Sequence, residues 1–345
     1  MKTTFISTTT LWNSPRSQLD KMQSDLIKAN KELSLGRHAD VGLALGYQTG
    51  YTISLRQDMA ELDALIDSNA DVKIRIDATS AALSSMRLTA EKFRASLISG
   101  PVSDRNMSVL QSEASANLDA LLGDLNKQVN GQYIFGGVNT QELPMKEFQT
   151  NAKTAIEAAF TGHFGFAPGS PAAEGITIAQ MDAFLDGPFA DLFEDPAWSD
   201  NWTNASPKAI QSSVSTSDRI ETSISAQAAG FRNLAKSYTM IMAIGLDAFH
   251  TDTRKHIVDR VITSISLGAT QVADQEAKIG SAKNLMTTSN ERMELQKTIF
   301  EERLAKFEGV DPAEAKIRVD QLATQIQVSY QLTAQLKSLS LVNYI

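Results

Sequence analysis

The chain has 345 residues, of which 42% are hydrophobic, so it can bury a sizeable core in two or three domains. Its net charge of −8 offers no basic field to attract nucleic acid or an anionic membrane, and we expect neither as a partner. The absence of cysteine excludes disulfides, thiolate nucleophiles and cysteine-ligated metals.

The first residues do not have the composition of a secretory signal. Met1 to Trp12 holds one lysine and many threonines, where a signal peptide has an apolar run of about 7 to 15 residues. No later window approaches the roughly 18 consecutive apolar residues of a transmembrane helix. If the protein leaves the cell, we expect export without a cleaved signal peptide.

A short heptad pattern opens the chain, and a long one follows it. The first pattern consists of Leu19, Met22, Leu26, Ala29 and Leu33. The second alternates steps of three and four and is apolar at nine of eleven positions: Leu62, Leu65, Asn69, Val72, Ile76, Thr79, Leu83, Met86, Ala90, Phe93 and Leu97. This spacing predicts a coiled-coil helix over Thr52–Ser99, about 70 Å long. Its two polar positions, Asn69 and Thr79, are expected to fix register at some cost in stability.

Gly100-Pro101 is expected to end this helix, and Ser103 or Asp104 to cap the next one. The apolar residues of that second helix predict a return leg: Leu110, Leu118, Leu121, Leu125 and Val129. The run Gly131–Thr140 then combines β-prone residues with a Gly-Gly pair, which favours a hairpin.

The composition changes in the middle of the chain. Residues 141–207 hold six of the nine prolines, seven of the fourteen phenylalanines and two of the three tryptophans. Proline at this density interrupts long helices, while the aromatic rings can fill a small core. We therefore predict a compact, inserted, partly β domain over residues 141–209.

The C-terminal part repeats the heptad pattern of the N-terminal part. Every seventh residue is apolar along one row: Val258, Ile265, Val272, Ile279, Met286, Met293 and Phe300. The neighbouring row is mostly small or polar: Val261, Gly268, Gln275, Ala282, Ser289 and Gln296. A helix with such a narrow seam needs larger residues on its partner, and the row from Leu62 to Leu97 can provide them.

A break at Gly309 is followed at once by helix-starting residues. Asp311 is a good N-cap, Pro312 suits the first helical position, and Glu314 can complete a capping box. The predicted last helix is Pro312–Ser338, with an apolar side formed by Val319, Leu322, Ile326, Leu332 and Leu336.

These elements predict a mainly α fold: a long antiparallel coiled-coil-like bundle built from both ends of the chain, with a small inserted partly β domain. Five segments are expected. Residues 1–48 form an N-terminal helix segment that pairs with residues 309–345; residues 49–140 and 210–308 form the helical rod; and residues 141–209 are inserted between them. Pairing residue 80 with residue 275 places the whole middle at the far end of the rod, a topology typical of fibre-forming subunits.

No pattern of catalytic or binding residues emerges from the sequence. The four histidines form no HExxH motif, and no glycine cluster matches a phosphate loop or a dinucleotide fingerprint. The acidic residues between Asp186 and Asp200 are typical of solvated loops. We therefore expect a protein that is not an enzyme and that has no cofactor and no metal site.

At both ends the sequence resembles the flagellin superfamily. The first heptad helix continues through Glu32–Arg37 to Ala39-Asp40, which is similar to the "LSSG" region of that superfamily. Two further segments are similar to its hook-filament junction members: Gly131–Thr140 resembles their "G-x-Y-x-F-x-G" region, and Leu339–Ile345 resembles their "SL-x-x-Y-L" ending. The resemblance covers roughly residues 1–140 and 210–345.

The resemblance implies an extracellular structural subunit of the bacterial flagellum at the junction of hook and filament. Its implied partners are copies of itself in a ring, the proximal hook-junction protein, flagellin, and a cytoplasmic export chaperone that binds near the C-terminus. Export through the flagellar type III apparatus is implied as well.

We expect the terminal seams to face neighbouring subunits, because isolated helices of this length are weakly stable in water. The candidate interface residues are Leu19, Met22, Leu26, Leu33, Leu322, Ile326 and Leu336. Three alternatives stay open: a filament flagellin, a cytoplasmic coiled-coil adaptor and, with the least support, an enzyme.

Overall fold

The computed structural model describes the backbone of residues 8–99 and 104–338, and the side chains of residues 16–99 and 107–335. The chain divides into two compact units. We call residues 1–63 with 293–345 the terminal unit, and residues 64–292 the central unit. The fold is mainly α, as predicted, with two small antiparallel hairpins.

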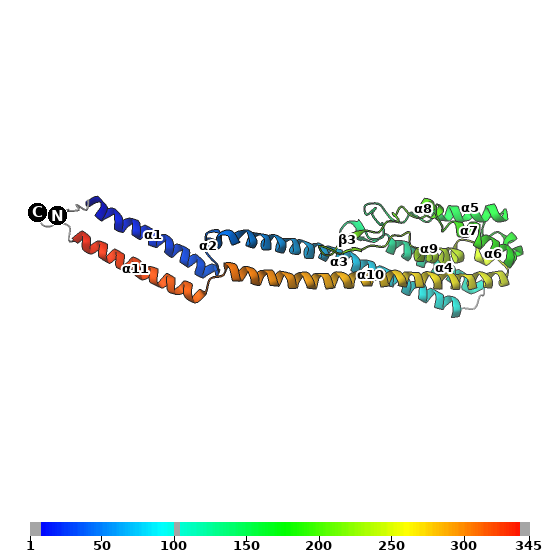
Figure 1. The fold of residues 1–345 in the computed structure, drawn as a ribbon. Coiled ribbons are helices and arrows are strands. Elements are labelled where there is room, and N and C mark those ends of the chain that lie inside the picture. Colours follow the sequence, from blue (N-terminus) through cyan, green and yellow to red (C-terminus); the bar gives the residue numbers. More distant parts are fainter. Residues whose placement is uncertain (1–7, 100–103, 339–345) are drawn as a thin grey trace. The chain divides into compact units, whose positions relative to one another are not determined.

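The terminal unit contains α1 (Thr8–Leu35), α2 (Val41–Leu45) and α11 (Pro312–Ser338), together with the start of α3 (Thr49–Ser99) and the end of α10 (Thr251–Glu308). α1 and α11 pack side by side (Figure 1). The bounds predicted for α11 are confirmed. Asp311 caps it, because its Oδ1 accepts a hydrogen bond from the Ala313 amide at 2.8 Å, while Glu314 accepts one from Arg318.

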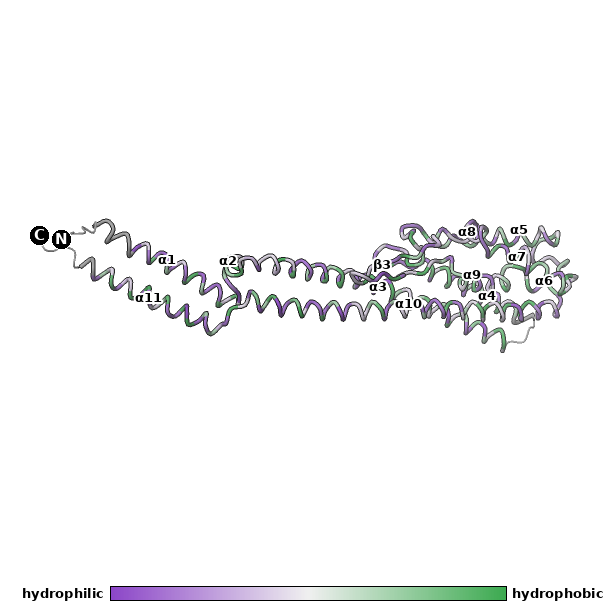
Figure 2. The backbone as a smooth tube through the Cα atoms, viewed as in Figure 1, coloured by the Kyte–Doolittle hydropathy of each residue, from purple (hydrophilic) through white to green (hydrophobic). Residues whose placement is uncertain are grey.

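The long seam predicted on α3 is buried along almost its whole length. Ten of its eleven residues are buried, and Leu65 is half-buried. On α10 the apolar row is buried from Val258 to Met293, and Phe300 is half-buried. Figure 2 shows hydrophobic and hydrophilic residues alternating along α10, as expected for a helix with a narrow apolar seam.

Polar contacts show the relative direction of α3 and α10 in the central unit. Asp77 pairs with Lys283 at 2.6 Å, and Arg87 with Glu276 at 3.1 Å. Residue numbers rise along α3 as they fall along α10, so the predicted antiparallel pairing is confirmed.

The two polar seam positions of α3 have different roles. Asn69 donates hydrogen bonds to the Val214 carbonyl at 2.8 Å and to Asn290 Oδ1 at 2.6 Å. Thr79, by contrast, donates to the carbonyl of Arg75 in its own helix at 2.8 Å. Of these two residues, only Asn69 makes a polar contact that can fix the register of α3 against α10. The hydrogen bond of Thr79 stays within α3 and does not support the register role predicted for it.

Helix α9 (Ala229–Met242) packs on α10 through glycines. A Cβ added at Gly268 would lie 2.9 Å from Cδ2 of Leu234, and one added at Gly230 would lie 3.0 Å from Cγ2 of Val272. α9 also packs against α4 (Asp104–Leu125), the predicted return leg. At Gly268, therefore, the small-residue row of α10 receives α9, a helix that the heptad pattern did not identify.

The first hairpin turns earlier than predicted. β1 (Gln128–Val129) pairs with β2 (Gln132–Tyr133) around Asn130-Gly131, whose φ angles are 51° and 76°. Two positive φ values suit a tight hairpin turn, and Asn-Gly is the dipeptide that favours it. The Gly-Gly pair at 136–137 instead allows close backbone approach, since a Cβ at Gly137 would lie 2.4 Å from the Ser206 carbonyl oxygen.

Residues 141–209 are more helical than expected. They contain α5 (Ala152–Phe164), α6 (Ile178–Asp186), α7 (Pro188–Asp191) and α8 (Ala197–Asn201). The β strands flank this segment instead, with β3 (Gln211–Ser213) and β4 (Arg219–Glu221) forming the second hairpin. Proline limits helix length without preventing helices, and Pro188 occupies the first turn of α7.

The aromatic core predicted for this segment is present. Neighbouring rings contact one another in a continuous series: Phe148, Trp202, Phe193, Phe189, Phe184, Phe160 and Phe249. All seven are buried. The described helices include none that is long and apolar enough to cross a membrane.

Candidate assembly surface

The seven predicted interface residues all lie on the paired helices α1 and α11, and the side chains of six of them are described. Gln23 Nε2 donates to the Tyr330 hydroxyl at 2.8 Å, and Arg318 pairs with Glu32 at 3.2 Å. This register brings Leu26 near Ile326.

Leu19, Met22, Leu26, Leu33, Leu322 and Ile326 are all half-buried. The side chain of Leu336 lies outside the described residues. By register, Leu19 and Met22 come near Ser329 and Thr333, which are too small and polar to complete an apolar seam. The pairing of α1 with α11 therefore covers the apolar rows of the two helices only in part.

Two carboxylates, the buried Glu308 and the half-buried Glu32, hold the backbone between α1 and α2 and between α10 and α11. Residues 37 and 309 form an isolated antiparallel bridge, with the His38 amide donating to the Glu308 carbonyl at 2.9 Å. The Glu308 side chain pairs with Arg56 and, at 3.9 Å, with Arg37. In the N-terminal segment, Glu32 Oε1 accepts from the Ala39 amide at 3.2 Å. Sequence patterns did not reveal this set of contacts, because ion pairs distant in sequence leave no periodic signal.

Exposed apolar side chains concentrate in the terminal unit. Of the 21 large apolar residues that are more than a third exposed, twelve lie there, although the unit holds fewer than a third of the described side chains. These twelve are Ile27, Leu35, Leu43, Tyr47, Tyr51, Ile53, Leu295, Ile299, Ile317, Val328, Tyr330 and Leu332. Single exposed apolar residues are ordinary, but this concentration makes the terminal unit the candidate region for contacts with other molecules. Of the twelve, only Leu332 belonged to a predicted apolar row.

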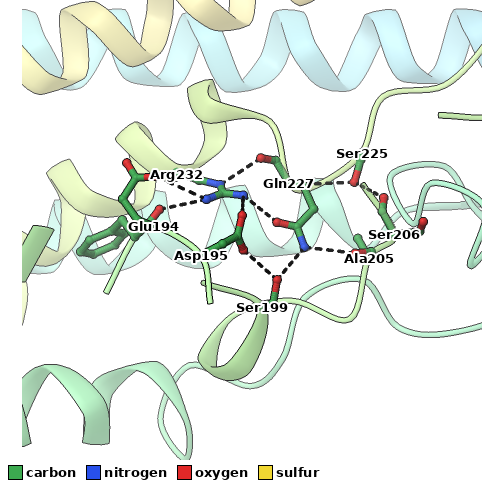
Figure 3. A network of polar contacts seen from close by, with 9 residues as sticks. Glu194, Asp195, Ser199, Ala205, Ser206, Ser225, Gln227 and Arg232 are labelled. Atoms are coloured by element: carbon green, nitrogen blue, oxygen red, sulfur yellow. Dashed lines mark hydrogen bonds and ion pairs between the residues drawn. The ribbon is translucent and has the colours of Figure 1, made fainter. Parts of the chain in front are cut away.

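The main polar network of the central unit has a structural role (Figure 3). Arg232 donates to Asp195 Oδ2 at 2.8 Å, to the Phe193 carbonyl at 3.3 Å, and to both the carbonyl and the side chain of Gln227. Its guanidinium also lies 5.6 Å from the ring centroid of Trp198. The guanidinium of Arg232 and the hydroxyl of Ser199 lower the pKa of the Asp195 carboxyl. This network joins the start of α9 to the loop before α8.

The described part of the chain presents no candidate metal centre. No group of three or more His, Asp or Glu residues there could hold a metal ion. His256 pairs with Asp182 at 2.7 Å, and His163 packs against the rings of Phe164 and Phe184. An open groove of about 720 Å³ between α10 and residues 207–232 has a mixed apolar and polar lining, with Glu221, Arg232 and Lys278 as its charged members.

Comparisons with known proteins relate both ends of the chain to one family. Residues 6–140 match the model described as the bacterial flagellin N-terminal helical region, and residues 262–345 match the bacterial flagellin C-terminal helical region. Together the two matches cover more than half of the chain. A search of curated proteins found no match.

Two solved structures are similar over most of the chain. One is described as a flagellar hook-associated protein from Vibrio parahaemolyticus; it is 12% identical, with a TM-score of 0.40, and the match covers 76% of this chain and 94% of that one. The other is FlgL from Bacillus cereus, at 10% identity and a TM-score of 0.39, covering 75% of this chain and 97% of that one.

Proposed function

Because the chain belongs to the bacterial flagellin family, and is thus a structural subunit of the flagellum, we propose that it forms the junction between hook and filament. The support for this position comes from the sequence. Gly131–Thr140 and the ending Leu339–Ile345 resemble the corresponding segments of junction proteins, although the second lies outside the described residues.

The proposed mechanism is polymerisation through the terminal unit. The carrying observation is the concentration of exposed apolar side chains there, next to the half-buried seam of α1 and α11. Burying apolar surface stabilises association by roughly 25 cal/mol per Å² before the costs of ordering are counted. Copies of the chain that pack by these surfaces would cover what one copy leaves exposed. We therefore assign Leu19, Met22, Leu26, Leu33, Leu322, Ile326 and Leu336 to contacts with neighbouring subunits.

The remaining partners are part of the same proposal. A ring at this position contacts the proximal junction protein on one side and flagellin on the other. We further propose that the protein is exported through the flagellar export apparatus without a cleaved signal, and that a chaperone binds it near the C-terminus. In this proposal the chain has five segments. Residues 1–48 and 309–345 form the inner helix segments, residues 49–140 and 210–308 form the rod, and residues 141–209 form the insert.

Immunolabelling of whole flagella tests the position. A single point of label between hook and filament supports the junction, whereas label along the shaft identifies a filament flagellin. Deletion of the gene gives an independent readout: loss of a junction subunit should leave hooks that release flagellin into the medium. Protein confined to the cytosol of a flagellated strain would instead support an adaptor and refute the proposal.

Hydrogen exchange on the isolated protein tests the mechanism. The backbone amides of α1 and α11 should exchange much faster in the monomer than in assembled flagella, since the seam is incomplete in one copy. Strong protection of both helices in the monomer would show that they need no neighbour.

A further inference from the structure

A charge-free surface lies on the segment that joins α1 to α3. Residues 41–55 contain no charged side chain, in a chain whose charged residues make up 21%. Leu43 is 80% exposed and Tyr47 is 92% exposed, so both bury almost nothing within their own chain. Tyr51 and Ile53 are about half exposed at the start of α3, on different sides of that helix because they are two residues apart. We call residues 41–53 the joint segment.

The joint segment is held in place by its own hydrogen bonds. Asp40 Oδ1 accepts from the Leu43 amide at 3.0 Å and caps α2. Thr49 Oγ1 donates to the Gly46 carbonyl at 2.8 Å and leads directly into α3. The two most exposed side chains therefore stand on an ordered backbone, which reduces the entropy lost when they are buried by a partner.

A second charge-free surface lies on the outer side of α11. No charged residue occurs between Gln321 and Leu336. Val328 and Leu332, four residues apart and so on one helical face, are each about half exposed. We call the exposed residues of this stretch up to Gln335 the α11 face.

The outer side of α1 differs sharply from the α11 face. Asp20, Lys21, Lys28 and Lys31 are all exposed along it. Packing the uncharged joint segment onto these charged side chains would cost their desolvation. Within the terminal unit, the α11 face is thus a better partner for the joint segment than α1.

We propose that the joint segment of one copy packs on the α11 face of the next copy. This inference rests on the proposed function and identifies which surfaces meet in the assembly. Because the two surfaces differ, the contact is heterologous, and contacts of this kind generate rings or helical arrays, whereas a self-complementary patch generates closed dimers. Leu43 and Tyr47 are the anchor residues on one side, and Val328 and Leu332 are their partners on the other.

Cysteine cross-linking tests the contact directly, since the chain has no cysteine of its own. Cells lacking the native gene would express Tyr47→Cys, Val328→Cys or both, and their isolated flagella would be treated with a short bis-maleimide. The double variant should give a ladder of multimers, and co-expressed single variants should give a dimer. Each single variant alone should stay monomeric. The pair Tyr47→Cys and Lys28→Cys, with the second cysteine on the outer side of α1, is the control and should give no ladder.

Several results would overturn the contact. A dimer from Tyr47→Cys alone would mean that like surfaces meet, and a product of another mass would mean that a different protein covers the joint segment. Immunolabelling of the same flagella separates the two proposals. Label at one point without a ladder refutes this contact and leaves the junction function standing, whereas absence of label from flagella refutes the function itself.

A second measurement does not depend on cross-linking. Leu43→Ser should reduce incorporation into flagella while leaving the thermal unfolding of the isolated chain unchanged, because the side chain is mostly exposed. Val138→Ser, which alters a half-exposed residue of the central unit, is the matched control and should incorporate normally. Equal incorporation of both variants would contradict the proposal.

Discussion

Replacing Gly268 with alanine should destabilise the central unit, although the same change usually stabilises a helix. Alanine in a helix interior is favoured over glycine by about 1 kcal/mol. At this position, however, the new Cβ would lie 2.9 Å from Cδ2 and 3.1 Å from the backbone nitrogen of Leu234. Overpacking of this kind costs about 1–3 kcal/mol, so we expect a net loss of stability of up to about 2 kcal/mol.

Gly280→Ala in the same helix is the matched control. A Cβ added at Gly280 meets no atom within 4 Å, so this variant should gain about 1 kcal/mol. The expected difference between the two variants is thus about 1–3 kcal/mol, set by the close approach of α9.

Urea unfolding followed by tryptophan fluorescence measures this difference. Trp198 and Trp202 are buried in the central unit and report on its unfolding. A Trp12→Phe background removes the third tryptophan of the chain. If Gly268→Ala proved as stabilising as Gly280→Ala, the close glycine contact between α9 and α10 would be refuted.

Three further predictions concern polar contacts of the central unit. Asn69→Ala should lower the free energy of unfolding in urea by about 1–3 kcal/mol, because the Val214 carbonyl and Asn290 Oδ1 lose their donor. Thr79→Ser keeps the hydroxyl bonded within its own helix and should lower it by less. The ammonium groups of Lys283 and Lys73 lower the pKa of Asp77 from its ordinary 3.8, so this carboxylate stabilises the fold above that pH and the contribution is lost as the pH falls below it. Asp77→Asn should therefore flatten the acid limb of a stability–pH curve; an unchanged limb would contradict the assignment. Arg232→Lys should lower the free energy of unfolding by about 1–3 kcal/mol, since an ammonium cannot reproduce the four hydrogen bonds of the guanidinium. Thermal unfolding measures this, with Arg219→Lys at an exposed position as the control. Equal melting temperatures of the two variants would refute the structural role of Arg232.

The sequence was sufficient wherever one local rule governed the outcome. Heptad spacing identified the buried rows of α3 and α10, because burial along a paired helix follows its period. Capping chemistry located the start of α11, since Asp311 and Pro312 act on the backbone next to them. The aromatic content of residues 141–207 likewise predicted buried aromatic packing in this segment, which is a matter of composition.

Only the tertiary structure decided outcomes that depend on residues far apart in the chain. Whether a polar seam residue reaches across to a partner, as Asn69 does and Thr79 does not, depends on which acceptor lies nearest. The fit of α9 against Gly268 depends on the distance between two backbones, which no periodicity encodes. Exposure of Leu43 and Tyr47 is decided in the same way, because an apolar side chain is buried only where another part of the fold covers it.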